Sequence, residues 1–196
     1  NLNINSKPKD VTAIDTNLIH PMTGPIYIEG AKRGDVLAVE LLDINPDDYG
    51  YTTLIPGFGF LPDLYKEPFV ANWKLNRVEA VSEQIPGVRI KMNAFMGSVG
   101  VMPGEPEVEA WLARETALGK VGGVALPPEP TGARPAEICG ANGSHKDRCL
   151  RTVPPRENGG NMDVKQMVRG TTLLLPCFID GCGFFIGDVH YAQGDG

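Results

Sequence analysis

The stretch TTLLLPCFIDGCGFFIGDVH, residues 171–190, decides the fold that we expect for this chain. It holds two apolar runs of strand length, residues 171–180 and 183–190, and glycine 181 lies between them. Apolar runs of this length bounded by glycine are typical of strands, and a short glycine-containing connection favours a hairpin. We therefore expect a hairpin whose second strand delivers Asp188 and His190 at its end.

The rest of the chain also has a composition that indicates short strands and many turns. Its 196 residues include 24 glycines and 17 prolines without a repeat period, which indicates many turns and short strands. The pattern predicts one helix, at residues 105–119 with Gly119 as its stop. It predicts a mainly β fold, with sandwich-like or barrel-like sheets, few short helices and long Pro/Gly-rich loops. Further strands are expected at residues 26–30, 36–44, 70–82 and 88–103.

We expect residues 1–196 to form a single domain with one long loop or insertion, residues 119–156. That segment has little periodicity and is rich in proline and glycine. Long segments without elements of their own are usually functional or disordered.

Charge and hydropathy narrow the classes of partner. The net charge of −6 leaves no basic surplus for nucleic acid or an anionic membrane surface. The apolar runs are shorter than the roughly 20 residues of a membrane-spanning helix. We expect a cytoplasmic protein, with export left open because the first residue is not methionine and the natural N-terminus is missing. Open sheet edges lead us to expect a homo-oligomer.

The four cysteines do not follow a metal-binding pattern, because neither pair is spaced as C-x-x-C. We expect buried free thiols. A disulfide between Cys139 and Cys149 remains open for an exported protein. Cys177 and Cys182 lie in apolar runs, which favours a structural role over a nucleophilic one.

Two polar clusters carry the candidate chemistry, ENGGNMD at residues 157–163 and the stretch that begins GDVH at residue 187. Asp188 and His190 are two residues apart in an extended stretch, so both side chains point to one face. They can act as metal ligands or as an acid–base pair, and a carboxylate with an imidazole suits zinc or a similar ion. The alternatives are a turn-forming aspartate and a hydrogen-bonded surface histidine.

Three other residues are weaker candidates. Glu29 is a carboxylate on an apolar strand, and His20 precedes a proline near an expected strand start. His145 lies in a very polar stretch and is expected to be exposed. The sequence has no nucleophile elbow, phosphate loop or dinucleotide-binding fingerprint.

Three blocks, in the same order, resemble the acetamidase/formamidase family. They are HPMTGPIYIEGAKRGDVLAVELLDI, RTVPPRENGGNMDVKQMVRGTTLLLPCFIDG and FFIGDVHYAQGDG, at residues 20–44, 151–181 and 184–196. The form PPRENGGN is similar to the longer formamidase branch. Members of the family have a further segment before the first block and continue after the last, so we expect this chain to lack both.

The resemblance implies an enzyme that hydrolyses formamide or acetamide to ammonia and a carboxylate, with a divalent metal for which zinc is expected. It places the site at Glu29, Asn161, Asp163, Asp188 and His190. We assign Asp163, Asp188 and His190 to the metal, Asn161 to orienting the amide, and Glu29 to proton transfer. The physical reason is that an amide is a poor electrophile, which a metal and a proton donor can activate.

Two other readings compete with the hydrolase. One is a catalytically inactive member or fragment that binds a small ligand or a metal. The other is a structural β domain that exposes residues 119–156 as an interaction loop.

Overall fold

The computed structural model describes residues 2–59, 61–122 and 128–194. It consists mostly of β-sheet with few short helices, which confirms the mainly β class. The chain divides into two compact units, one of residues 1–15, 43–95 and 190–196 and the other of residues 16–42 and 96–189. No helix among the described residues is both long enough and apolar enough to cross a membrane.

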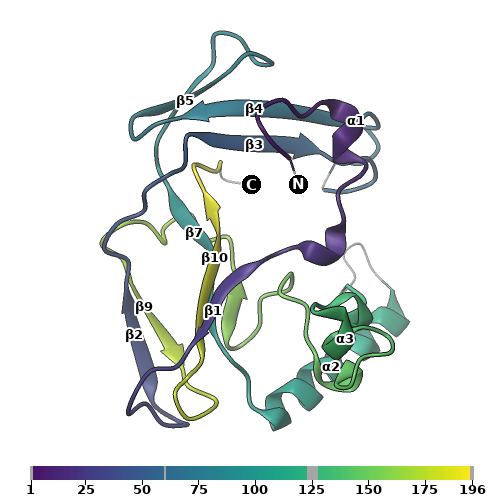
Figure 1. Ribbon diagram of the computed structural model, residues 1–196, viewed down its shortest axis with the longest axis vertical. Coiled ribbons are helices and arrows are strands. Elements are labelled where there is room, and N and C mark those ends of the chain that lie inside the picture. The colour runs from purple at the N-terminus through teal and green to yellow at the C-terminus, as the bar shows by residue number, and fades with distance from the viewer. Residues whose placement is uncertain (1, 60, 123–127, 195–196) are drawn as a thin grey trace. The chain divides into compact units, whose positions relative to one another are not determined.

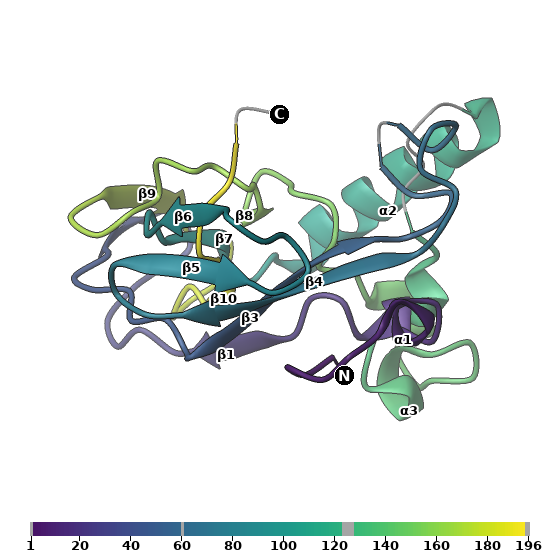
Figure 2. The same cartoon turned by 90° about the horizontal axis from the view of Figure 1, so that it is seen from above.

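The first unit contains a four-stranded antiparallel sheet in the order β3-β4-β5-β6 (Figure 2). Its core is formed by Ala71, Trp73 and Ala80. The expected strand at 70–82 is split because the Asn76 side chain accepts the backbone N–H groups of Val78 and Glu79, which closes a turn. The strands are β3 (Tyr49–Leu54), β4 (Phe69–Leu75), β5 (Glu79–Ser82) and β6 (Arg89–Lys91), and the short helix α1 is Pro8–Val11.

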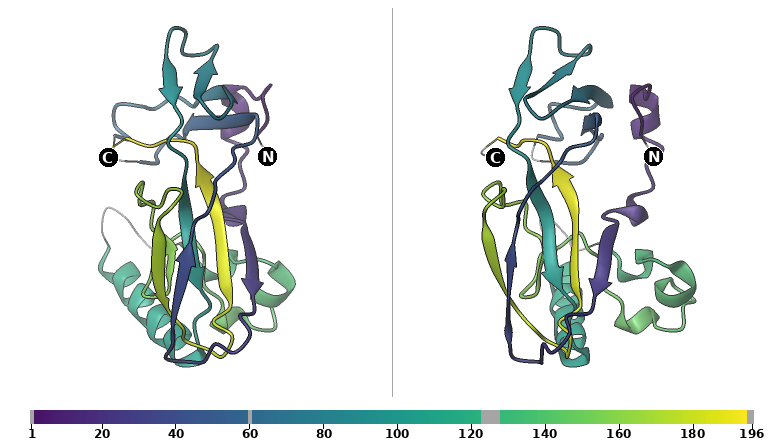
Figure 3. Two further views of the ribbon diagram at one scale, coloured as in Figure 1. Left: turned by 90° about the vertical axis from the view of Figure 1, so that its left-hand side faces the viewer. Right: turned by 60° about the vertical axis from the view of Figure 1, so that its left-hand side comes forward.

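The main sheet of the second unit has the order β1-β10-β7-β8. Its strands are β1 (Met22–Ile26), β7 (Phe95–Val101), β8 (Gly159–Asn161) and β10 (Phe184–His190). β1, β10 and β7 run side by side in Figure 1, and the yellow β10 lies along the teal β7 in Figure 3. Every residue of β7 is buried. The last residue of β10 and the first of β7 are grouped with the first unit, so these two strands continue past the division.

The expected hairpin of residues 171–180 and 183–190 is wrong. β9 (Thr172–Pro176) pairs with β2 (Val36–Glu40) in a separate two-stranded sheet, whereas β10 pairs with β1. The connection between β9 and β10 is closed by a Cys177–Cys182 disulfide. Three consecutive residues of it, 181–183, have φ between 53° and 75°. β9 and β10 thus belong to different sheets.

Helix α2, Glu105–Val121, is longer than the expected 105–119, because Gly119 lies inside it. It ends at Gly122, whose φ of 77° is a conformation that favours glycine. Trp111 is its buried anchor, and the Trp111 ring meets Phe178 edge-on with centroids 5.8 Å apart.

The expected loop of residues 119–156 contains short helical elements where it is described, and residues 123–127 lie outside the described part. Its elements are η2 (Pro130–Gly132), α3 (Ala136–Cys139) and η3 (Lys146–Arg148); another short helix, η1, is Thr16–Leu18. A Cys139–Cys149 disulfide closes the segment. The expectation of free thiols is therefore wrong: all four cysteines are disulfide-bonded, and the alternative left open for Cys139 and Cys149 is the one found.

Candidate active site

Strand β8 brings Asn161 onto the sheet. Gly159 and Gly160 have φ of 87° and 100°, and a side chain at Gly159 would clash with the Val99 carbonyl oxygen, so β8 can lie close against β7 only with glycine there. Asn161 pairs with Ser98, whose hydroxyl donates to the Asn161 side-chain oxygen at 3.2 Å. The Asn161 amide nitrogen donates to the Val153 carbonyl at 2.9 Å. The Asn161 side chain is thus held in one orientation, with an N–H and a lone pair left for a ligand.

Asp163 follows in a strained turn. The backbone N–H groups of Met162 and Asp163 both donate to the Gly97 carbonyl at 3.0 Å, which fixes the turn on β7. Asp163 has φ of 50° and its side chain is exposed. Left-handed backbone at a residue other than glycine is uncommon and gathers at functional sites.

Asp188 shows the same strain on β10, with φ of 53°. Among the described residues, the only non-glycine residue with positive φ besides the two aspartates is Cys182. His190 ends β10 two residues later, and its ring stacks at a tilt on Phe95 with centroids 4.7 Å apart. Asp163, Asp188 and His190 each offer one ligand atom, and these atoms all lie within 4.8 Å of one another. The structure therefore brings together the three residues that the sequence assigns to a metal.

His20 belongs to the same group of side chains, although only a weak signal in the sequence indicated it. Its Nδ1 lies 3.2 Å from the Asp188 carboxylate, and the two side chains are only 22% and 20% exposed. Thr152 fixes this histidine from both sides, because its hydroxyl accepts the His20 backbone N–H at 2.8 Å and donates to the His20 carbonyl at 2.9 Å. A histidine before a proline was the only signal available, since Thr152 and Asp188 are far away in the sequence.

Glu29 lies elsewhere. β1 runs antiparallel to β10, with Met22 opposite Gly187 and Ile26 opposite Phe184, so Glu29 follows the end of β1 that is remote from Asp188. The side chain of Glu29 is exposed. The structure does not bring it to the other four expected site residues.

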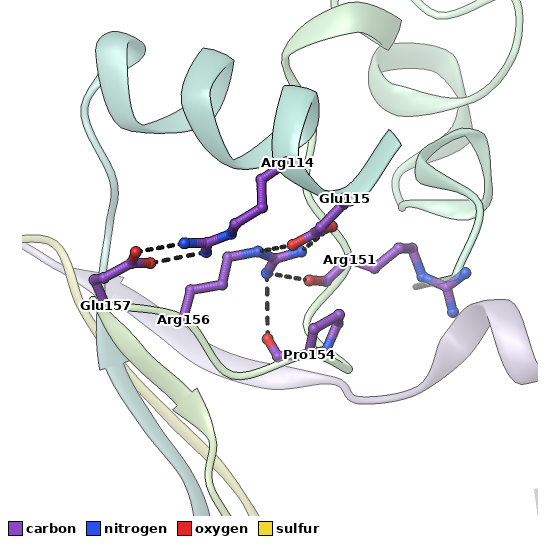
Figure 4. A network of polar contacts seen from close by, with 6 residues as sticks. All are labelled: Arg114, Glu115, Arg151, Pro154, Arg156 and Glu157. Atoms are coloured by element: carbon purple, nitrogen blue, oxygen red, sulfur yellow. Dashed lines mark hydrogen bonds and ion pairs between the residues drawn. The ribbon is translucent and has the colours of Figure 1, made fainter. Parts of the chain in front are cut away.

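Two ion pairs attach the turn before β8 to helix α2 (Figure 4). Arg156 donates to both carboxylate oxygens of Glu115, at 2.6 and 2.9 Å, and these side chains are 6% and 11% exposed. Arg114 makes a similar fork to Glu157, but both of these side chains are about half exposed. The hydrogen bonds from Arg114 lower the pKa of Glu157 from 4.5 to about 2. α2 thus holds the turn from which Asn161 and Asp163 continue.

The donor set fits a divalent metal. Two carboxylates and one imidazole that converge from two strand ends are ligands that zinc and similar first-row ions accept. Catalytic zinc sites commonly use three protein ligands and leave a further position for water or substrate.

Comparisons with known proteins agree in sequence and in fold. The sequence pattern described as the Acetamidase/Formamidase family matches residues 1–196. An acetamidase of Mycolicibacterium smegmatis is 35% identical over 216 residues, which cover 98% of this chain and 52% of the relative. A formamidase of Methylophilus methylotrophus is 32% identical over 204 residues, which cover 98% of this chain and 50% of the relative.

Solved structures of similar sequence also share the fold of this chain. A gamma lactamase from Delftia acidovorans matches with a TM-score of 0.88 and 33% identity, over 100% of this chain and 51% of that one. An acetamidase from Bacillus halodurans matches with a TM-score of 0.68 and 29% identity, over 94% of this chain and 48% of that one. The chain thus spans about half the length of these relatives.

Proposed function

The chain belongs to the acetamidase/formamidase family, and from this premise we propose that it hydrolyses a short linear amide, formamide or acetamide. The amide C–N bond breaks, water supplies one of the two carboxylate oxygens together with a proton for the nitrogen, and the nitrogen leaves as ammonia. The observation that carries the proposal is the convergence of Asp163, Asp188 and His190 within 4.8 Å. Relatives of this chain named acetamidase and formamidase support the choice of substrate.

We propose that these three residues hold a divalent metal, with zinc as the expected ion. Bound there, zinc would polarise the amide carbonyl and lower the pKa of a water molecule. Asn161 would orient the amide, because its side chain is fixed by Ser98 and Val153 and keeps one donor and one lone pair.

The leaving nitrogen must gain a proton. The sequence proposes Glu29 for this step, but its exposed position beyond the remote end of β1 gives the assignment no support. We propose His20 instead, because its Nδ1 meets Asp188 and its backbone is clamped by Thr152. With Nδ1 directed at the carboxylate, Nε2 is the atom from which a proton can move.

The proposal is tested by ammonia release from formamide and acetamide, together with the metal content of the full chain. We expect bound zinc and turnover that a chelator abolishes. Asp188→Asn should lower kcat/KM at least a hundredfold, whereas Asp180→Asn should not, since Asp180 is a half-exposed surface partner of Lys32. Bound metal without ammonia release would favour a binding-only member of the family, and turnover that resists chelation would contradict the metal.

We also propose a homo-oligomer without nucleic-acid or membrane partners. Support comes from the acidic net charge and from the open edges of the sheets, such as β3 and β6 in the first unit. Light scattering coupled to size-exclusion chromatography measures the oligomeric state directly, and a monomer at all concentrations would contradict it.

A further inference from the structure

A cavity of about 460 Å³ lies within the second unit. Its walls come from the first half of α2, from residues 145–154, and from β8 and β10. None of the metal-ligand candidates lines it, so its role is a separate question.

The floor of the cavity lies next to the proposed amide-orienting residue in the chain. Gly159 and Gly160 both line the cavity, and Asn161 is the following residue of β8. Gly100, which pairs with Gly159, has no side chain, and a Cβ there would clash with the Phe185 ring. The Phe185 ring therefore lies against Gly100, and Phe185 also lines the cavity.

Another wall of the cavity includes Thr152, which contacts His20 of the proposed site. Thr152 lines the cavity, and the same hydroxyl clamps the backbone of His20. His20 in turn contacts Asp188. The cavity is thus lined by the residue that precedes Asn161 and by the residue that holds the backbone of His20, the partner of Asp188.

The polar side chains in the inner walls are directed at other protein groups. Asn158 donates to the Val101 carbonyl at 2.6 Å, and Arg151 donates to the Thr16 carbonyl at 2.8 Å. Arg156 donates to both carboxylate oxygens of Glu115 (Figure 4). What remains to meet a ligand is largely apolar, from Met102, Val108, Leu150 and Phe185.

The rim is charged and braced. Arg148 and Glu105 both line the cavity and pair with each other at 2.8 Å, and both side chains are exposed. The Cys139–Cys149 disulfide holds the outer wall. A concave apolar interior with a few polar groups at its margin is the usual character of a small-molecule site.

We propose that this cavity receives the apolar acyl group of an amide larger than acetamide, such as an alkyl or aryl carboxamide. The inference rests on the proposed amide hydrolysis and deepens it. A cavity of about 150 Å³ is enough to bind benzene, so this one has room for a six-carbon chain or a phenyl ring. Formamide and acetamide would leave most of it to water.

The test compares kcat/KM of the full chain for acetamide, hexanamide and benzamide. We expect the wild-type protein to prefer hexanamide over acetamide at least tenfold, because each buried methylene adds a favourable transfer free energy. Val108→Trp fills the cavity and should lower the hexanamide-to-acetamide ratio at least tenfold. Leu118→Trp, on the same helix but 53% exposed and outside the cavity, should leave the ratio unchanged.

A wild-type ratio near one, or a ratio that Val108→Trp does not change, would overturn the proposal. Release of ammonia from none of the amides would instead reject the proposed hydrolysis. The cavity is then tested by thermal unfolding with hexanamide. A rise in Tm in the wild type that Val108→Trp removes would support an apolar-ligand site, and no rise would overturn it. If Val108→Trp does not fold, thermal unfolding with hexanamide is measured on Val108→Phe instead, and the same outcomes support or overturn the proposal.

Discussion

Replacing Glu115 by glutamine should destabilise the protein strongly, whereas the same change at Glu157 should not. Glu115 of α2 pairs with Arg156, and Glu157 pairs with Arg114 of α2. Both forked ion pairs therefore join α2 to the turn before β8 (Figure 4). They differ in burial. Glu115 and Arg156 are 11% and 6% exposed, and Arg114 and Glu157 are 47% and 52% exposed.

The magnitudes follow from that difference. Removing one partner of a buried pair leaves the other charge uncompensated and costs about 3–5 kcal/mol, while an exposed pair contributes about 0–1 kcal/mol. Arg156 would keep its bonds to the Arg151 and Pro154 carbonyls, so we expect the lower end, about 3 kcal/mol. For a chain of 196 residues this lowers Tm by about 6–12 °C, against less than about 4 °C for Glu157→Gln.

The assay is urea unfolding of the two variants and the wild type, followed by circular dichroism, with calorimetry for Tm. A double variant, Glu115→Leu with Arg156→Met, removes both charges and should be less destabilised than Glu115→Gln alone. Equal and small effects of Glu115→Gln and Glu157→Gln would refute the reasoning, because they would mean that Arg156 is solvated after all.

Three further predictions concern pH, backbone and redox state. Since Arg114 lowers the pKa of Glu157 to about 2, the pair's small stabilisation is complete above about pH 4.5 and is lost as pH falls towards 2; Glu157→Gln should remove that part of the pH dependence of unfolding. Gly159→Ala should lower the free energy of unfolding by more than about 2 kcal/mol, because Gly159 has a φ of 87° and its new side chain would meet the Val99 carbonyl. Gly119→Ala should raise it by about 0.5–1 kcal/mol, because Gly119 is helical and nothing lies near its Cβ position. Urea unfolding measures both. Thiol titration of the denatured, unreduced protein should find no free cysteine, and free thiols would contradict the disulfides.

Local patterns predicted the parts of the structure that depend on neighbouring residues. Strand period and glycine content predicted the mainly β class, and the two-residue spacing placed Asp188 and His190 at the end of one strand. Asp163 was assigned to the same site through the family resemblance, and its ligand atom lies within 4.8 Å of those of Asp188 and His190.

The failures arise where distant residues decide. The residues after β9 look like a hairpin turn in sequence, but β9 pairs with β2, which lies far away in the sequence. Gly119 reads as a helix stop, yet α2 continues to the left-handed Gly122. His20 lies at the site because Thr152 binds its backbone and Asp188 contacts its ring, and no local pattern connects these residues to it.

The measurement that tests the central claim most directly is the initial rate of ammonia release from acetamide by the full chain, as purified, after chelation and after zinc is restored. We predict turnover that chelation abolishes and that zinc returns in the wild type but not in Asp188→Asn. Absence of ammonia under all three conditions, from a folded protein, would contradict amide hydrolysis by this chain.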